Sequence, residues 1–354
     1  MTEIVKLFAQ DKEYRTALGL PDEITEEYKP LAQGEYNVNY SFVHPLTGVK
    51  LVMRINVGSQ MHLDRQIEYE AHALKLIEKS GRTPKVLYAD GSKRLCDYGM
   101  LVMEYMPGDY LDYADDEEMK AAMECLADIH AVAIDGEEVI WGEPDAVPRE
   151  TIKLIAPADS AEAILDECEA MVKTYMDSPL GDDGIKQRLR ALLDRAHEIA
   201  EMPSDGAKDA YRCCINTELN STNFLVRNDE RIPHACLVDW EKPLYGDPAQ
   251  DLGHMLAPTT TFWKTDVVLN VGETESLIDE YIKAVSGRFD TTGLKERTMR
   301  LIKVTCLRGL TWCAMAWVEY KDPKKTIANE STRKKLDAYL SDEFLSKIEL
   351  MLAN

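Results

Sequence analysis

The sequence lacks several features that mark common classes of protein. It has eight cysteines, but no two stand at C-x-x-C spacing, which argues against the usual zinc and thiol redox motifs. No apolar run approaches the length of a membrane span, and the N-terminus lacks the apolar stretch of a signal peptide. No internal repeat or low-complexity segment is present. We therefore expect a globular cytoplasmic protein with reduced cysteines and no membrane partner.

Basic residues are also scarce. The chain has 41 Lys and Arg against 63 Asp and Glu, which gives a formal net charge of −22. Such a chain repels a phosphate backbone, so nucleic acid is not an expected partner. A cationic small-molecule substrate is compatible with this charge, and so is a plain contribution to solubility.

The order of the predicted elements indicates two lobes. A length of 354 residues is enough for both. The patterns predict a helix within residues 1–30, strands over 31–43 and 49–57, a helix over 62–79 and two strands that end at Pro107-Gly108. Helices follow at 116–134, 159–177, 183–202, 275–286, 295–320 and 331–352, with short β-runs between 211 and 240. We expect an α+β fold with an N-terminal lobe over 1–106, a C-terminal lobe over 107–354, and a cleft between them.

Oxygen-bearing side chains gather in residues 214–254. Glu218 and Asn223 stand five residues apart, and Asp239 ends the second of two β-runs that follow. Mg²⁺ takes hard oxygen ligands, and phosphoryl transfer needs bound magnesium, a cation on the phosphates and a carboxylate beside the hydroxyl. A hairpin would bring Asp239 back beside the loop that carries Glu218 and Asn223.

Three ordered motifs in this segment, NTELNSTN, LVDWE and GDPAQDLGH, resemble those of the aminoglycoside phosphotransferase and choline kinase family. The resemblance implies a bilobal protein-kinase-like fold, with a small antiparallel sheet and one main helix in the N-terminal lobe. It implies that Asn223 and Asp239 bind magnesium, and that Asp247 and Asp251 brace the loop and face the substrate lobe. Glu218 stands where the family has its catalytic Asp, and Asn216 where it has His; both are departures from the family pattern.

The N-terminal third is similar to the family as well. Gly34 is the single glycine of a poor glycine loop, with Asn37 or Asn39 near its tip. The resemblance assigns Arg54 to the nucleotide phosphates and Glu70 to the ion pair that holds Arg54, with Glu68 as the other candidate partner.

Two further assignments concern the walls of the cleft. Backbone groups around Glu104–Met106, in LVMEYMPG, would meet the adenine edge. The wall for the acceptor would come from residues 255–354, with TTTFWK (259–264), Trp312, Trp317 and Tyr320 as candidates. We interpret His130 as a packing residue.

The expected activity is ATP- or GTP-dependent transfer of a γ-phosphoryl group to a hydroxyl of a small molecule, with Mg²⁺. Aminoglycosides, choline or ethanolamine, sugars, amino-acid derivatives and macrolides remain candidate acceptors. The departures at Asn216 and Glu218 keep a second hypothesis open, a nucleotide-binding pseudokinase that acts as a sensor or scaffold. A protein kinase is disfavoured, because Trp-Glu follows Asp239 and only seven residues separate Asp239 from Asp247.

Overall fold

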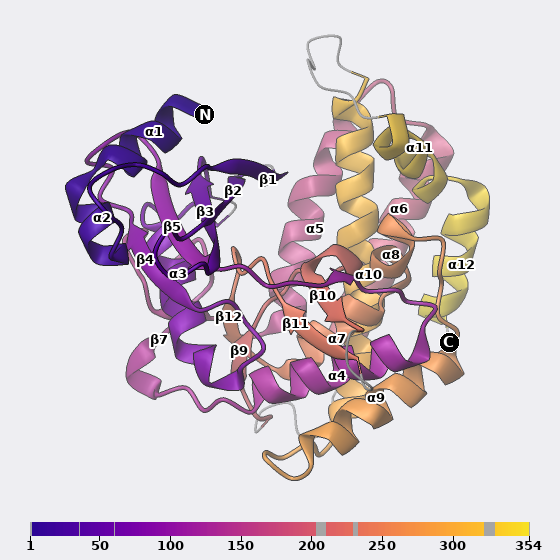
Figure 1. The fold of residues 1–354 in the computed structure, drawn as a ribbon. Coiled ribbons are helices and arrows are strands. Elements are labelled where there is room, and N and C mark those ends of the chain that lie inside the picture. Colours follow the sequence, from indigo (N-terminus) through magenta and orange to yellow (C-terminus); the bar gives the residue numbers. More distant parts are fainter. Residues whose placement is uncertain are drawn as a thin grey trace.

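A small β-sheet lobe and a larger helical lobe make up the protein, seen in a computed structural model that describes residues 2–34, 36–59, 61–202, 210–228, 233–321 and 330–353. Figure 1 shows the sheet and its helices on one side, and long helices on the other, with short strands between them. The expected two-lobed α+β architecture is confirmed.

The N-terminal lobe is built on one antiparallel sheet. Its strand order is β1-β2-β3-β5-β4, with bounds β1 (Lys29–Gln33), β2 (Asn37–Val43), β3 (Lys50–Asn56), β4 (Val86–Asp90) and β5 (Gly99–Glu104). The predicted run over 31–43 is therefore two strands, β1 and β2. The turn between β2 and β3 closes at Gly48, whose φ of 72° is a conformation that glycine adopts without strain.

Alternation along β3 decides which side chains face which helix. Met53 and Ile55 pack beneath the N-terminal helices α1 (Thr2–Gln10) and α2 (Lys12–Leu18), which cover one face of the sheet. Val52 and Arg54 point to the opposite face, where α3 (Gln66–Ile77) lies. The period of two thus turns Arg54 toward the helix that carries Glu70.

The helical lobe is organised around α10. Its helices are α4 (Asp116–His130), α5 (Ser160–Asp177), α6 (Asp183–Glu201), α7 (Pro248–Leu256), α8 (Pro258–Lys264), α9 (Val271–Val285), α10 (Leu294–Glu319), α11 (Glu330–Tyr339) and α12 (Asp342–Ala353). α10 packs chiefly against α5 and α7. By length and composition α10 could cross a membrane, which the sequence analysis did not anticipate. However, 61% of its apolar window is buried inside the protein, as in a core helix.

Short strands connect the two lobes. β10 (Phe224–Arg227) lies between β11 (His234–Leu237) and β6 (Asp109–Tyr110), β9 (Cys213–Ile215) pairs with β12 (Leu244–Gly246), and β7 (Val139–Trp141) pairs with β8 (Leu154–Ala156). In the β10–β11 hairpin Phe224 pairs with Leu237, and the Val238 N–H donates to the Asn223 carbonyl at 2.8 Å. This register places the residue before β10 beside the residues after β11.

Several predicted helix boundaries were wrong for identifiable reasons. The helix predicted within 1–30 is two helices, because Asp11 accepts from the Tyr14 N–H and starts α2. The helix predicted over 331–352 is also two, because the Ser341 hydroxyl accepts from the Phe344 N–H at the start of α12. The sequence analysis did not predict α8. TTTF is a β-type pattern, but Pro258 stands directly before it, in the first turn of the helix, where proline favours a helix start.

Candidate active site

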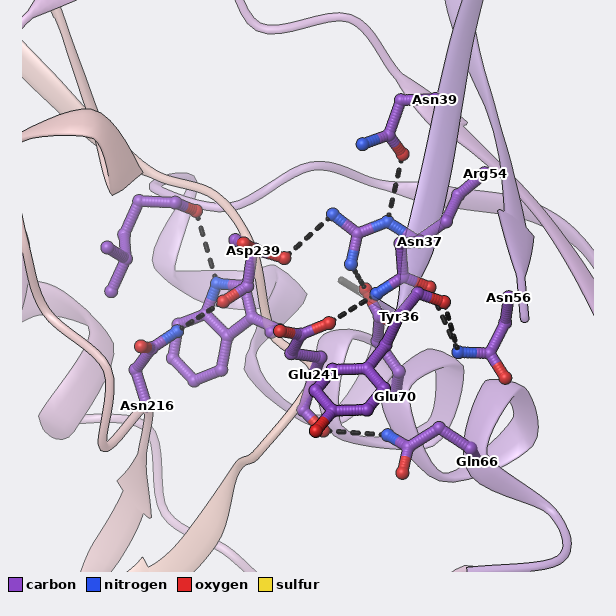
Figure 2. A network of polar contacts seen from close by, with 12 residues as sticks. Tyr36, Asn37, Asn39, Arg54, Asn56, Gln66, Glu70, Asn216, Asp239 and Glu241 are labelled. Carbon is purple, nitrogen blue, oxygen red and sulfur yellow. Dashed lines mark hydrogen bonds and ion pairs between the residues drawn. The ribbon is translucent and has the colours of Figure 1, made fainter. Parts of the chain in front are cut away.

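Arg54 connects the two lobes at the centre of the site. Its Nη1 donates to Glu70 Oε1 at 2.6 Å, its Nη2 to Asp239 Oδ1 at 2.9 Å and its Nε to Asn39 Oδ1 at 3.1 Å. Figure 2 shows these three bonds leaving the guanidinium in different directions. Of the two predicted partners on α3, Glu70 is the one in contact, while Glu68 pairs with Arg65.

The Arg54 guanidinium keeps its charge in a buried position. Burial alone would lower the pKa of Arg54, but Glu70 and Asp239 outweigh it and raise the pKa further above its usual range. Burial raises the pKa of the Glu70 carboxyl, and the Glu70 Oε2 atom has no hydrogen-bond partner among the described residues. A guanidinium has five N–H donors, so the three bonds leave two for a phosphate oxygen.

A buried carboxylate fixes the loop that carries Glu218. Asp251, which is fully buried in α7, accepts from the backbone N–H groups of Asn216 at 2.8 Å and Thr217 at 2.7 Å. It also contacts His130 Nε2 at 3.1 Å, and His130 Nδ1 contacts the Tyr281 hydroxyl at 2.7 Å. His130 is therefore buried, as expected of a packing residue, and it also orients Asp251.

Asn216, one of the two departures from the family pattern, contacts a residue predicted to bind magnesium. Asn216 donates from its side chain to the Asp239 carbonyl at 2.9 Å, so it helps to hold Asp239 in a backbone conformation with φ of 65°. Of the two carboxylates predicted to brace this loop, Asp251 does so through the Asn216 and Thr217 N–H groups. The Asp247 carboxylate instead caps α7 by accepting from the Ala249 N–H, and it pairs with Arg297 of α10.

Asn223 and Asp239 lie at the same end of the β10–β11 hairpin. The Asn223 side-chain nitrogen donates to the Glu218 carbonyl at 2.7 Å, which leaves its amide oxygen for another partner. Arg54 occupies Asp239 Oδ1, so Oδ2 is the oxygen that remains. These two oxygens fit magnesium, which needs only one or two side chains beside phosphates and waters. Within the described ranges, no group of three or more His, Cys, Asp or Glu side chains is arranged to hold a metal.

Glu218 does not stand alone in the site. Its Oε1 accepts from Arg308 Nη2 at 2.9 Å, and its side chain is 25% exposed. Burial would raise the pKa of Glu218, but the charges of Arg308 and Lys242 outweigh it and hold the pKa below its usual range. Glu218 is therefore an ionised carboxylate at neutral pH.

A cavity of about 320 Å³ opens beside Glu218. Its wall includes Thr259, Thr260 and Trp263 of the predicted TTTFWK segment and the predicted Trp312. Trp317 and Tyr320 lie outside it, and the Trp317 ring nitrogen donates to Asp337 at 2.8 Å. Sequence reasoning missed Glu167, His254, Arg308 and Tyr339 as wall residues. No local signal marks them, because they come from α5, α7, α10 and α11.

The predicted adenine segment is already partly engaged. The Glu104 N–H donates to the Lys85 carbonyl at 2.9 Å and the Tyr105 N–H to the Lys50 carbonyl at 3.3 Å. These two N–H groups are therefore not available to a base, and the assignment of backbone groups around Glu104–Met106 to the adenine edge stays a prediction. A nucleotide edge would have to be read by the Met106 N–H or by carbonyl groups of the same segment.

The glycine loop reaches the helical lobe. The Gly34 N–H donates to the Asn37 carbonyl at 2.9 Å and closes the turn between β1 and β2. The Asn37 side chain donates to Glu241, two residues after Asp239, and Tyr36 lines the cavity. Figure 2 shows Asn37, Arg54 and Glu241 side by side, so the loop covers the Asp239 region.

A two-lobed kinase-like fold with this site defines a class of phosphotransferases, and the comparisons with known proteins agree. The profile described as the phosphotransferase enzyme family matches residues 27–295, and the chain belongs to that family. The resemblance seen in the sequence motifs is thereby confirmed, and the chain is an enzyme of the small-molecule phosphotransferase class. No curated protein matches the sequence.

Solved structures share the fold at low sequence identity. An ethanolamine kinase from Plasmodium vivax is 14% identical, with a TM-score of 0.61 and coverage of 97% of this chain and 89% of that one. A microcompartment-associated aminopropanol kinase is 14% identical, with a TM-score of 0.61 and coverage of 98% and 99%. A spectinomycin phosphotransferase in complex with ADP and spectinomycin is 10% identical, with a TM-score of 0.59 and coverage of 95% and 94%.

Proposed function

We propose that the protein transfers the γ-phosphoryl group of ATP or GTP to a hydroxyl group of a small molecule in the cytoplasm. The observation that carries this proposal is Arg54, which is buried between the lobes and paired with both Glu70 and Asp239. Because Glu70 belongs to the N-terminal lobe and Asp239 to the C-terminal lobe, Arg54 is held in place to bind phosphates only when the two lobes are in contact. Solved relatives with this fold hold ADP or GDP, which supports a nucleotide in the cleft.

Each site residue has a role in the proposed reaction. Arg54 donates its two remaining N–H groups to the phosphates, and Glu70 keeps its guanidinium in place. Asn223 and Asp239 would hold Mg²⁺, which when bound neutralises the phosphate charge. The acceptor oxygen bonds to the γ-phosphorus as the bond to the β-phosphate oxygen breaks, and Glu218 takes the hydroxyl proton.

The arrangement of Glu218 suits this role. Its Oε1 is fixed by Arg308, so Oε2 is the oxygen that can meet the hydroxyl. The extra methylene of Glu relative to Asp moves the carboxylate outward, and the ion pair with Arg308 limits where it can go. A carboxylate positioned in this way contributes about 10²–10⁴ in rate to proton transfer.

The test is nucleotide consumption with magnesium against a panel of hydroxylated acceptors. We expect Asp239→Ala to lower acceptor-dependent turnover by at least about 100-fold, because a metal ion contributes several kcal/mol to the transition state. Glu218→Gln should lower kcat without weakening nucleotide binding. Asp266→Ala is the matched control, since that side chain is 94% exposed and its ion pair among the described residues is with Lys335.

Full activity in Asp239→Ala would remove the metal assignment. Tight nucleotide binding by the wild type, with no turnover for any acceptor, would instead favour the nucleotide-binding sensor.

A further inference from the structure

Arg308 of α10 holds the loop that carries Glu218 at two points. Its Nη2 donates to Glu218 Oε1 at 2.9 Å. Its Nη1 contacts His254 Nε2 at 3.4 Å, and His254 Nδ1 donates to the Leu219 carbonyl at 3.0 Å. The Glu218 side chain and the backbone of the next residue are therefore both held, directly or through His254, by the same guanidinium.

Arg308 is itself fixed by a further series of contacts. Its Nε donates to Glu167 Oε2 at 2.8 Å, and Glu167 Oε1 accepts from Lys242 Nζ at 2.5 Å. The Lys242 carbonyl accepts from the Thr217 hydroxyl at 2.8 Å. These contacts form a ring that begins at Glu218 and ends at the residue before it. The Arg308 side chain is 16% exposed, so the guanidinium has little room to move.

The length of the Glu218 side chain fits this arrangement. An Asp at the same position lacks one methylene and so loses about 1.5 Å of reach. The 2.9 Å contact with Arg308 would open to about 4 Å, which is beyond the range of a hydrogen bond. Because Glu167 and His254 hold Arg308 from two other directions, the guanidinium cannot follow a shorter carboxylate without breaking those contacts.

We propose that Glu218 and Arg308 act as a pair, in which Arg308 is the positioning residue that orients the Glu218 carboxylate toward the acceptor hydroxyl. This inference rests on the proposed function, and it adds a residue that acts through Glu218 without touching the reacting atoms. The pair also accounts for the departure from the family pattern. The longer acid reaches Arg308, whereas the family's Asp would not.

Restoring the family's acid with Glu218→Asp is the sharpest test. If the site needed only a carboxylate here, this variant would keep the activity of the wild type. If the contact with Arg308 positions the carboxylate, Glu218→Asp should lower kcat by about 100-fold, the effect of a misplacement of about 1 Å. The KM for the nucleotide should stay within about twofold of the wild type, because Glu218 does not bind the nucleotide. Both constants are measured by acceptor-dependent nucleotide consumption.

Variants of Arg308 test the other member of the pair. Arg308→Met should also lower kcat by about 100-fold, and the double variant with Glu218→Asp should stay within about threefold of either single variant, because the same contact is lost in all three. Arg308→Lys keeps a cationic donor and should recover about tenfold of the loss in kcat.

Arg188→Met is the matched control for the loss of an arginine with several partners. Arg188 donates to Glu349 and Asp342 and so links α6 to α12, and it is not among the described residues that line the cavity. Its substitution should destabilise the protein without changing kcat. Thermal unfolding of each variant establishes that it is folded before its kinetics are compared.

Urea unfolding of the wild type, Glu218→Asp, Arg308→Met and the double variant gives a readout that needs no acceptor. Arg308→Met loses its contact with Glu167 in both backgrounds, so the comparison isolates the contact with Glu218. Arg308→Met should raise the equilibrium constant for unfolding at least about fivefold more in the wild-type background than in the Glu218→Asp background.

The outcomes separate the pair from the reaction. Wild-type kcat in Glu218→Asp, or losses that multiply in the double variant, would overturn the positioning role and leave the proposed function standing. Equal effects of Arg308→Met on unfolding in the two backgrounds would also overturn the pair. If the wild type transfers phosphate to no acceptor, the proposed function fails, and the role of the pair fails with it.

Discussion

Asp251→Asn is the substitution that most directly tests how the Glu218 loop is held. The side chain keeps its size, so no cavity forms. One oxygen becomes an NH₂ group, and the Asn oxygen can still accept from the Thr217 N–H. In the wild type, the Asn216 N–H and His130 Nε2 both contact Asp251 Oδ2. In the variant, these two groups face the new NH₂ group.

The expected cost follows from these contacts. His130 can change tautomer, accept from the new NH₂ group and donate through Nδ1 to the Tyr281 hydroxyl, so that contact survives. The Asn216 N–H is left buried without an acceptor, which costs about 1–3 kcal/mol. Asp251→Ala removes the acceptor for all three groups, and the expected loss rises to roughly 3–6 kcal/mol.

Urea unfolding followed by far-ultraviolet circular dichroism measures both values. We expect a loss of about 2 kcal/mol for the Asn variant and a clearly larger loss for the Ala variant. A change below about 0.5 kcal/mol in Asp251→Asn would mean that the loop is held by other contacts, and would refute the reasoning.

Two other substitutions test the walls of the cavity. The charges of Arg308 and Lys242 outweigh burial and lower the pKa of Glu167 to about 2 from 4.5. Because this folded-state pKa is depressed, its stabilisation is present above pH 4.5 and is lost as the pH falls toward 2. Glu167→Gln should therefore lower the free energy of unfolding by about 1 kcal/mol at pH 7, a value that allows for the partial exposure of Glu167. The loss, measured from urea midpoints, should become progressively smaller at pH 4 and pH 3. An equal loss at every pH would contradict this. Gly309→Ala would place a Cβ 2.6 Å from the Thr259 Cβ, so α8 and α10 must separate, at about 1–3 kcal/mol in thermal unfolding. Gly136→Ala, with nothing within 4 Å, should be neutral; equal effects at the two glycines would argue against close packing of α8 on α10.

The parts of the site that the sequence could predict are those set by local pattern. Strand alternation turns Arg54 toward α3, and a short hairpin returns Asp239 to Asn223. These relations depend on periodicity and on a few residues of separation, so they are visible in the sequence. Their metal and phosphate roles stay predictions.

The parts that could not be predicted depend on contacts between distant segments. Arg308 reaches Glu218 across 90 residues, and Glu167 reaches Arg308 across 141 residues. Glu167 lies in α5 and Arg308 in α10, and a charged residue on a helix is normally solvated. Only the packing of α5 against α10 brings them together.

In the proposed function, the position of α10 ties the choice of acceptor to the stability of the fold. Thr305, Arg308 and Trp312 line the cavity from the same helix whose other faces pack against α5 and α7. A substitution that reshapes the cavity from α10 therefore also strains the core. Divergence toward new acceptors is more accessible through α8, a short helix of seven residues, where Thr260 and Trp263 face the same cavity. Laboratory evolution for a new acceptor should accumulate its first changes in α8.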